Sequence, residues 1–139
     1  MKQLLIAVCA ILAFVLIGCN SIAADKEVAL AKIVTIHEQL NNQDIEGIKS
    51  DISPMMLKDI SMSGIEKMFT MIHTKLGKVK SSKNTKAMTG NIDSESAITL
   101  INDTIFEKGK GVETFTFHVK NGRATLLGYN IRIPDMKME

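Results

Sequence analysis

The stretch that decides the fold is residues 113–122, which read ETFTFHVKNG. From Phe115 to Val119 every second side chain is apolar, as in a strand with one buried face. Asn121-Gly122 then gives the strongest short hairpin signal, because both positions of a two-residue turn need a positive φ angle. We therefore predict an antiparallel hairpin in which Lys120 lies opposite Arg123.

The register of this hairpin predicts two further pairs. Phe117 should lie opposite Leu126, and Phe115 opposite Gly128. A large ring facing a glycine can cover the bare backbone of that glycine. The last strand should continue as far as Pro134, which cannot extend it as a hydrogen-bond donor.

Two earlier segments also alternate with a period of two. Residues 78–88 form a weak, lysine-rich strand, and residues 97–107 form a stronger one that is rich in Ile, Thr and Leu. Gly109-Lys110-Gly111 is expected to turn the chain into the hairpin. Apolar residues occur on both faces of these strands, so we expect helices on one side of the sheet and partial cover on the other.

The segment before the strands has helical periodicity instead. We expect a helix over residues 25–41 that is capped by Asp25, a short helix capped by Asp44, and a further turn that begins at Ser53-Pro54. The best helix should begin at Ser63-Gly64-Ile65-Glu66, which has the spacing of a capping box, and should end at Gly77.

Helices followed by antiparallel strands indicate an α+β fold. We predict a single cone-like domain over residues 25–139, with N-terminal helices packed on a curved antiparallel sheet of about four strands. A chain of this length can bury one core without the help of a metal or a disulfide.

The N-terminus has the order of a secretory signal, with Lys2, an apolar core over residues 4–17, and a small residue before Cys19. The apolar core is shorter than the ~20 residues that a membrane-spanning helix needs. Leu16-Ile17-Gly18-Cys19 resembles the bacterial lipobox, in which the peptide bond before the Cys is cut and the Cys carries acyl chains. This resemblance implies a signal peptide over residues 1–18 and a membrane contact through lipid on Cys19.

An ordinary signal peptidase site around Ser21-Ile22-Ala23-Ala24 is the alternative, and its product would diffuse freely. Under the lipobox interpretation, residues 19–24 form a lipidated tether. Asp after the Cys favours the inner membrane in such lipoproteins, so Asn20 implies the periplasmic face of the outer membrane. Cys9 leaves with the signal, so the mature chain cannot form an internal disulfide.

Four segments of the chain resemble the second half of small exported bacterial domains of unknown function. These domains belong to the cone-shaped α+β superfamily named after nuclear transport factor 2, which is similar in shape to cystatin. The resemblance covers residues 25–133, and Ala124 departs from it because such families usually have Trp at that position. The matching segments are residues 76–81, 112–114, 121–123 and 127–131.

In enzymes of that superfamily, a carboxylate or His inside the cone transfers a proton with help from a Tyr hydroxyl. The resemblance therefore implies Asp103, His118 and Tyr129 as the catalytic candidates. From the residues alone, Asp103 is equally readable as a solvated side chain, and His118 as a hydrogen-bonded side chain on a sheet face.

The leading hypothesis is a lipid-anchored, non-enzymatic protein of the cell envelope that binds a small ligand or an envelope protein. A pocket between the helices and the concave sheet is expected to be lined by Phe106, Phe117, His118, Leu126 and Tyr129. The alternatives are a small proton-transfer enzyme and an assembly or inhibitory module that acts through a sheet edge.

No cofactor is predicted, and no metal site, because His37, His73 and His118 lack zinc-ligand spacing. A lysine run over residues 75–86 does not indicate nucleic-acid binding, since no aromatic residues are interleaved with it. On an edge strand, these lysines would discourage pairing between sheets, and contact with anionic lipid head groups is the alternative.

Overall fold

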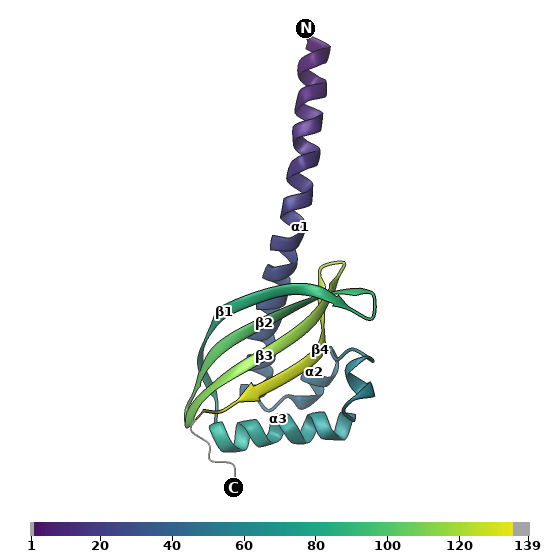
Figure 1. The fold of residues 1–139 in the computed structure, drawn as a ribbon. Coiled ribbons are helices and arrows are strands. Elements are labelled where there is room, and N and C mark those ends of the chain that lie inside the picture. The colour runs from purple at the N-terminus through teal and green to yellow at the C-terminus, as the bar shows by residue number, and fades with distance from the viewer. Residues whose placement is uncertain (1, 135–139) are drawn as a thin grey trace.

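The computed structural model describes the backbone of residues 2–134 and the side chains of residues 22–134. Helices precede a four-stranded antiparallel sheet that is not closed, so the predicted α+β class is confirmed (Figure 1). The elements in chain order are α1 (Lys2–Asn41), α2 (Ile45–Lys49), the 3-10 helix η1 (Met56–Lys58), α3 (Met62–Leu76), β1 (Val79–Ile92), β2 (Glu95–Phe106), β3 (Gly109–Lys120) and β4 (Arg123–Arg132).

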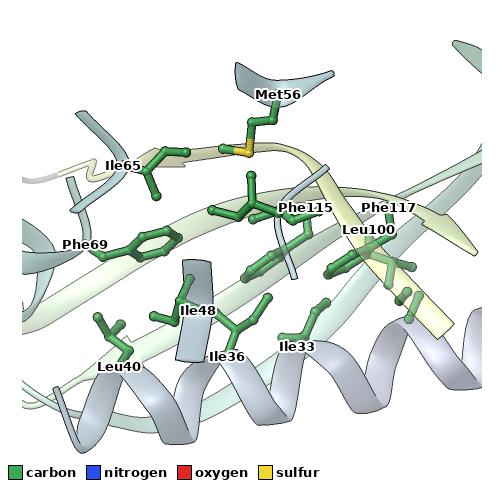
Figure 2. Close-up of a cluster of buried hydrophobic side chains, with 14 of the residues drawn as sticks. Ile33, Ile36, Leu40, Ile48, Met56, Ile65, Phe69, Leu100, Phe115 and Phe117 are labelled. Carbon is green, nitrogen blue, oxygen red and sulfur yellow. The ribbon is translucent and has the colours of Figure 1, made fainter. Parts of the chain in front are cut away.

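The four strands form a meander in the order β1-β2-β3-β4. The inner face of the sheet packs against helices and carries the buried aromatic residues Phe115 and Phe117. Ile33 and Leu40 from α1 and Phe69 from α3 complete this core, as Figure 2 shows. In the described part of the chain the helices pack on this face only (Figure 1), so the partial cover expected on the second face is not seen.

The β3–β4 hairpin has the predicted turn. Lys120 pairs with Arg123, and Phe117 pairs with Leu126. Asn121 and Gly122 both have positive φ angles, 53° and 73°, as a two-residue turn of this kind requires.

Beyond these pairs the predicted register is wrong by one residue, because β4 contains a β-bulge. Thr116 pairs with Gly128 and Phe115 with Tyr129, which leaves Leu127 as the extra residue. An extra residue reverses the alternation of all side chains after it. Tyr129 therefore lies on the inner face beside Phe115, where the regular register would have put Gly128.

The β2–β3 turn also differs from the prediction. Phe106 pairs with Gly109, so the turn consists of Glu107 and Lys108, and the predicted turn residues 109–111 belong to β3. The glycine at position 111 has a packing reason instead. A Cβ atom there would lie 2.9 Å from Cδ1 of Ile131, so a larger residue would require the Ile131 side chain to move.

Helix α1 is longer than expected. It runs without a break from Lys2 to Asn41, through the predicted tether over residues 19–24 and past the predicted cap at Asp25. Extending an existing helix by one residue costs far less than nucleating one, so the apolar N-terminal segment and the residues after it form one helix in the unprocessed chain.

The other helix boundaries depend on local side chains. Asp44 caps α2 as predicted, accepting a hydrogen bond from the Gly47 amide (3.0 Å). Ser61 rather than Ser63 caps α3, so the predicted capping box is two residues out of place. Gly77 ends α3 with φ 77°, as predicted.

Segment 51–53 lies along β4 and covers part of that edge. The Leu126 amide donates to the Asp51 carbonyl (2.8 Å), and the Ser53 amide donates to the Leu126 carbonyl (2.9 Å). At the other end of the sheet, β1 is an edge strand, so its lysines lie where they oppose pairing with another sheet.

Asp51 also joins α1 to the β3–β4 hairpin through its side chain. The carboxylate accepts hydrogen bonds from Lys32 Nζ and from Arg123 Nη2, the latter at 2.8 Å. Burial opposes ionisation of Asp51, but the hydrogen bonds from the two bases outweigh it and lower the pKa of Asp51 below its ordinary 3.8.

A lowered pKa makes this carboxylate stabilising above pH 3.8, and that contribution is lost as the pH falls through the folded-state value. Asp51→Asn is therefore expected to unfold at lower urea than wild type at neutral pH. Below pH 3.8 the two proteins should converge. Urea midpoints on both sides of that pH test this, and a gap between the two proteins that does not change with pH would contradict it.

Candidate functional site

The three catalytic candidates do not meet. Asp103 is exposed on the outer face of the sheet, since its neighbours Asn102 and Thr104 are both buried on the inner face. His118 also lies on the outer face, between the inward-facing Phe117 and Val119, whereas Tyr129 lies inside. The convergence that the enzyme alternative requires is not present, because strand alternation separates the first two from the core and the bulge turns Tyr129 into it.

Both ring nitrogens of His118 lie near oxygen atoms at the start of β2. Its Nδ1 lies 2.8 Å from the Ser96 carbonyl oxygen, and its Nε2 lies 3.8 Å from Glu95 Oε2. These contacts join β3 to the start of β2, which agrees with the interpretation of His118 as a hydrogen-bonded residue on a sheet face.

The residues predicted to line a pocket are mostly part of the packed core. Phe106, Phe117 and Leu126 are each at most 2% exposed. The Tyr129 ring packs against Phe69 and Phe115, with centroids 5.1 and 5.0 Å apart. The inner face at these residues is thus filled by side chains, and the fifth predicted residue, His118, lies on the other face.

A polar cluster occupies the inner face at Glu113, which is 1% exposed. Its Oε1 lies 2.8 Å from Nε2 of His37 on α1 and accepts a hydrogen bond from the Thr104 hydroxyl (2.5 Å). Its Oε2 accepts from the Tyr129 hydroxyl (2.7 Å). Three elements besides β3 therefore each direct one donor at a single buried carboxyl group, which is the arrangement that makes such burial tolerable.

Tyr129 responds to this environment. Burial raises its pKa well above the ordinary 10.0, and the charge of Glu113 and the hydrogen bond to it raise it further. The phenol is therefore held in its neutral, donating form.

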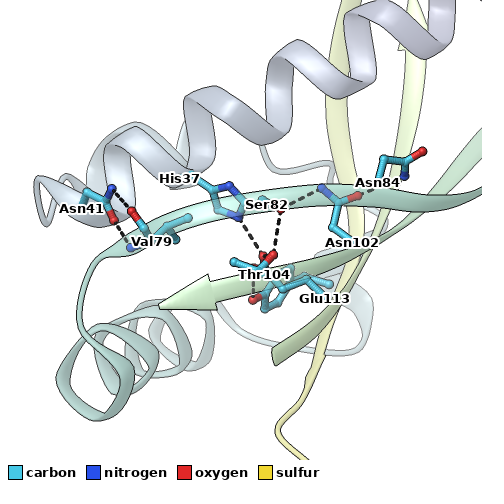
Figure 3. Close-up of polar contacts among 9 residues, drawn as sticks. His37, Asn41, Val79, Ser82, Asn84, Asn102, Thr104 and Glu113 are labelled. Carbon is cyan, nitrogen blue, oxygen red and sulfur yellow. Dashed lines mark hydrogen bonds and ion pairs between the residues drawn. The ribbon is translucent and has the colours of Figure 1, made fainter. Parts of the chain in front are cut away.

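The cluster continues to the surface under β1 (Figure 3). The Thr104 hydroxyl lies 2.8 Å from Ser82 Oγ, which also accepts from Asn102 Nδ2 at 3.0 Å. Ser82 is exposed. A chain of hydrogen bonds thus connects solvent to the buried Glu113.

Asn41 fixes the end of α1 to the start of β1 beside this cluster. Its Oδ1 accepts from the Val79 amide (2.8 Å) and its Nδ2 donates to the Val79 carbonyl (3.3 Å), as Figure 3 shows. Together with the His37–Glu113 contact, one turn away, this pair sets the position of α1 on the sheet.

Sequence reasoning missed this cluster although one signal was present. Glu113 precedes Phe115 and Phe117 at intervals of two, so the alternation itself places it on the buried face. His37 lies next to Ile36 on α1, and both side chains are buried. Its partner was not predictable, since the register between α1 and the sheet is set by tertiary packing.

The cluster ties α1 to the sheet through hydrogen bonds to one buried carboxyl group. The described residues contain no group of three His, Cys, Asp or Glu side chains that could hold a metal ion. Within the same part of the chain, none of the helices has the length and apolar content needed to cross a bilayer. The predicted lipid site, Cys19, belongs to α1, and its side chain lies outside the described ones.

A separate pocket of about 320 Å³ lies where α1 approaches the β1–β2 hairpin. Ile22 and Asp25 of α1 form one wall, and Gly90, Ile98 and Val119 of the sheet contribute to the other. It does not reach the Glu113 cluster, whose residues are not among those that line it.

No protein-family model and no curated protein matches the chain. Among solved structures, the chain is similar to that of Bd1075 from Bdellovibrio bacteriovorus, with 12% identity and a TM-score of 0.48. The match covers 78% of this chain and 41% of that one, so the chain spans less than half the length of that protein. At this identity and TM-score, the similarity implies nothing about function.

Proposed function

We propose that the chain is a lipid-anchored protein of the cell envelope whose domain is a non-enzymatic binding module. The proposal that the domain is non-enzymatic depends on the burial and the hydrogen bonds of Glu113. The carboxyl group is shielded from solvent and already has a donor from each of His37, Thr104 and Tyr129. A carboxylate whose oxygens already accept hydrogen bonds from the protein stabilises the fold. A partner would therefore bind at the surface of the domain.

The anchoring half of the proposal is supported by the sequence around Cys19. The motif Leu16-Ile17-Gly18-Cys19 closes the apolar core, and acyl chains on one Cys give stable attachment when there are two or more. The resemblance to the nuclear transport factor 2 superfamily and the placement at the outer membrane belong to this proposal as well. The order of helices before the sheet agrees with the resemblance.

Lipidation is tested by growing cells that express the full chain with labelled palmitate. Wild type is expected to incorporate label and to sediment with membranes, because its acyl chains bury many methylene groups at ~0.8 kcal/mol each. Cys19→Ser should lose both properties while the domain remains folded by circular dichroism. Unlabelled wild-type protein, or a mature N-terminus at Ala23 or Ala24, would contradict the lipid anchor.

A further inference from the structure

The outer face of the sheet carries a patch of bases and apolar residues around one acid, Asp103. Lys83, Asp103, Val112 and Arg132 form one row across all four strands. Neighbouring rows place Lys86 beside Ile101 and Lys110 beside Ile105. We define the outer patch by four bases and two apolar residues: Lys83, Lys86, Lys110, Arg132, Ile101 and Ile105.

The apolar residues of the patch are accessible. Ile105 is 43% exposed, and Ile101 and Val112 are partly exposed. Ile101 and Ile105 each lie two residues from Asp103 on β2, and Val112 lies opposite Asp103 on β3, so the three side chains surround that acid on the outer face. A grouped apolar surface with a charged rim is typical of a contact site, whereas single exposed apolar residues are not.

The charge of the patch is one-sided. Four bases surround one acid, Asp103, while the whole chain has a net charge of only +2. In the described part of the chain, none of these four bases takes part in an ion pair within 4.0 Å. The bases are therefore available to an outside partner of opposite charge.

We propose that the outer patch binds an acidic, amphipathic segment of another envelope protein. This rests on the proposed function and names the kind of partner that the binding module takes. Apolar side chains of the segment would cover Ile101 and Ile105, and its carboxylates would pair with the bases of the rim. The contact combines burial of apolar side chains with charge complementarity. The charge complementarity favours a negatively charged partner over a positively charged one.

Two other occupants fit less well. A second copy would meet the patch in a two-fold arrangement and set the four bases against one another. A membrane contact is disfavoured by position. The rows of Ile105 and Asp103 lie toward the Glu107–Lys108 turn, and the N-terminal half of α1, which carries Cys19, projects from the opposite end of the body (Figure 1).

The test uses the full-length protein in non-ionic detergent and a synthetic amphipathic helix with a leucine face and a glutamate face. Fluorescence anisotropy is expected to show binding that weakens with added salt. Lys83→Glu with Arg132→Glu should weaken binding by roughly tenfold or more. Ile105→Ser should weaken it several-fold at unchanged charge.

The matched control is Lys67→Glu with Lys75→Glu, which makes the same charge change on the exposed surface of α3. It should bind the peptide as wild type does. Equal weakening by both double variants would mean that net charge alone drives binding, and would overturn the proposal. So would a homodimer that Lys83→Glu dissolves, or stronger binding to vesicles of anionic lipid than to the peptide. Because the peptide assay does not depend on acylation, these outcomes are distinct from failure to label Cys19.

Discussion

Replacing Glu113 with Ala is expected to lower the free energy of unfolding by about 3–5 kcal/mol, since three buried polar groups lose their partner at about 1–3 kcal/mol each. The substitution leaves the hydroxyls of Thr104 and Tyr129 and the ring nitrogen of His37 without their acceptor. Unmatched polar groups that stay buried cost more than the original hydrogen bonds contributed. Urea unfolding monitored by far-ultraviolet circular dichroism measures the change.

Asp103→Ala is the matched control, because it removes a carboxylate on the neighbouring strand that faces solvent. It should change stability by no more than about 0.5 kcal/mol. If Glu113→Ala costs as little as Asp103→Ala, the cluster does not hold α1 to the sheet.

Deletion of Leu127 is expected to straighten β4 without moving Tyr129 to the other face, since the pairs Phe117–Leu126, Thr116–Gly128 and Phe115–Tyr129 then follow one another without the extra residue. Tyr129 would still point inward, and its hydrogen bond to Glu113 would be kept. The chain has one Tyr and no Trp, so quenching of intrinsic fluorescence reports on this residue alone. Acrylamide should quench the deletion variant no more strongly than wild type.

Leu127→Ala keeps the number of residues in β4 and serves as the control. It should cost about 1 kcal/mol and leave Tyr129 as protected from quencher as in wild type. A deletion variant in which acrylamide quenches Tyr129 strongly would contradict the assignment of Leu127 as the extra residue of the bulge.

The sequence predicted the parts of the fold that depend on local patterns. The period of two and the Asn121-Gly122 turn located the hairpin, and the apolar stripe with Gly77 located α3. The boundaries that failed depended on choices between similar local signals, such as Ser61 against Ser63 as the cap.

The candidate site was harder because one bulge decides it. Nothing local distinguishes Leu127 from a regular strand residue, and a shift of one position moves Tyr129 between the faces. Asp103 and His118 were selected by resemblance. Strand alternation places both on the outer face, and the bulge places Tyr129 on the inner face. Glu113 was within reach of the pattern, since it precedes Phe115 by two residues on the same face.

Tyr129 also makes the free energy of unfolding fall as the pH becomes alkaline. Its pKa is higher in the folded state than the 10.0 of an unfolded chain, so its contribution is complete below pH 10.0 and is lost as the pH rises above it.

The most direct test of the buried Glu113 cluster is a titration of Tyr129 by tyrosinate absorbance. The chain has a single Tyr, so the signal comes from this residue alone. We predict an apparent pKa well above 10.0 in wild type, and a lower one in Glu113→Gln, in which the charge next to the phenol is removed. A wild-type Tyr129 that ionises at 10.0 would show an accessible phenol without a carboxylate partner, and would contradict the account.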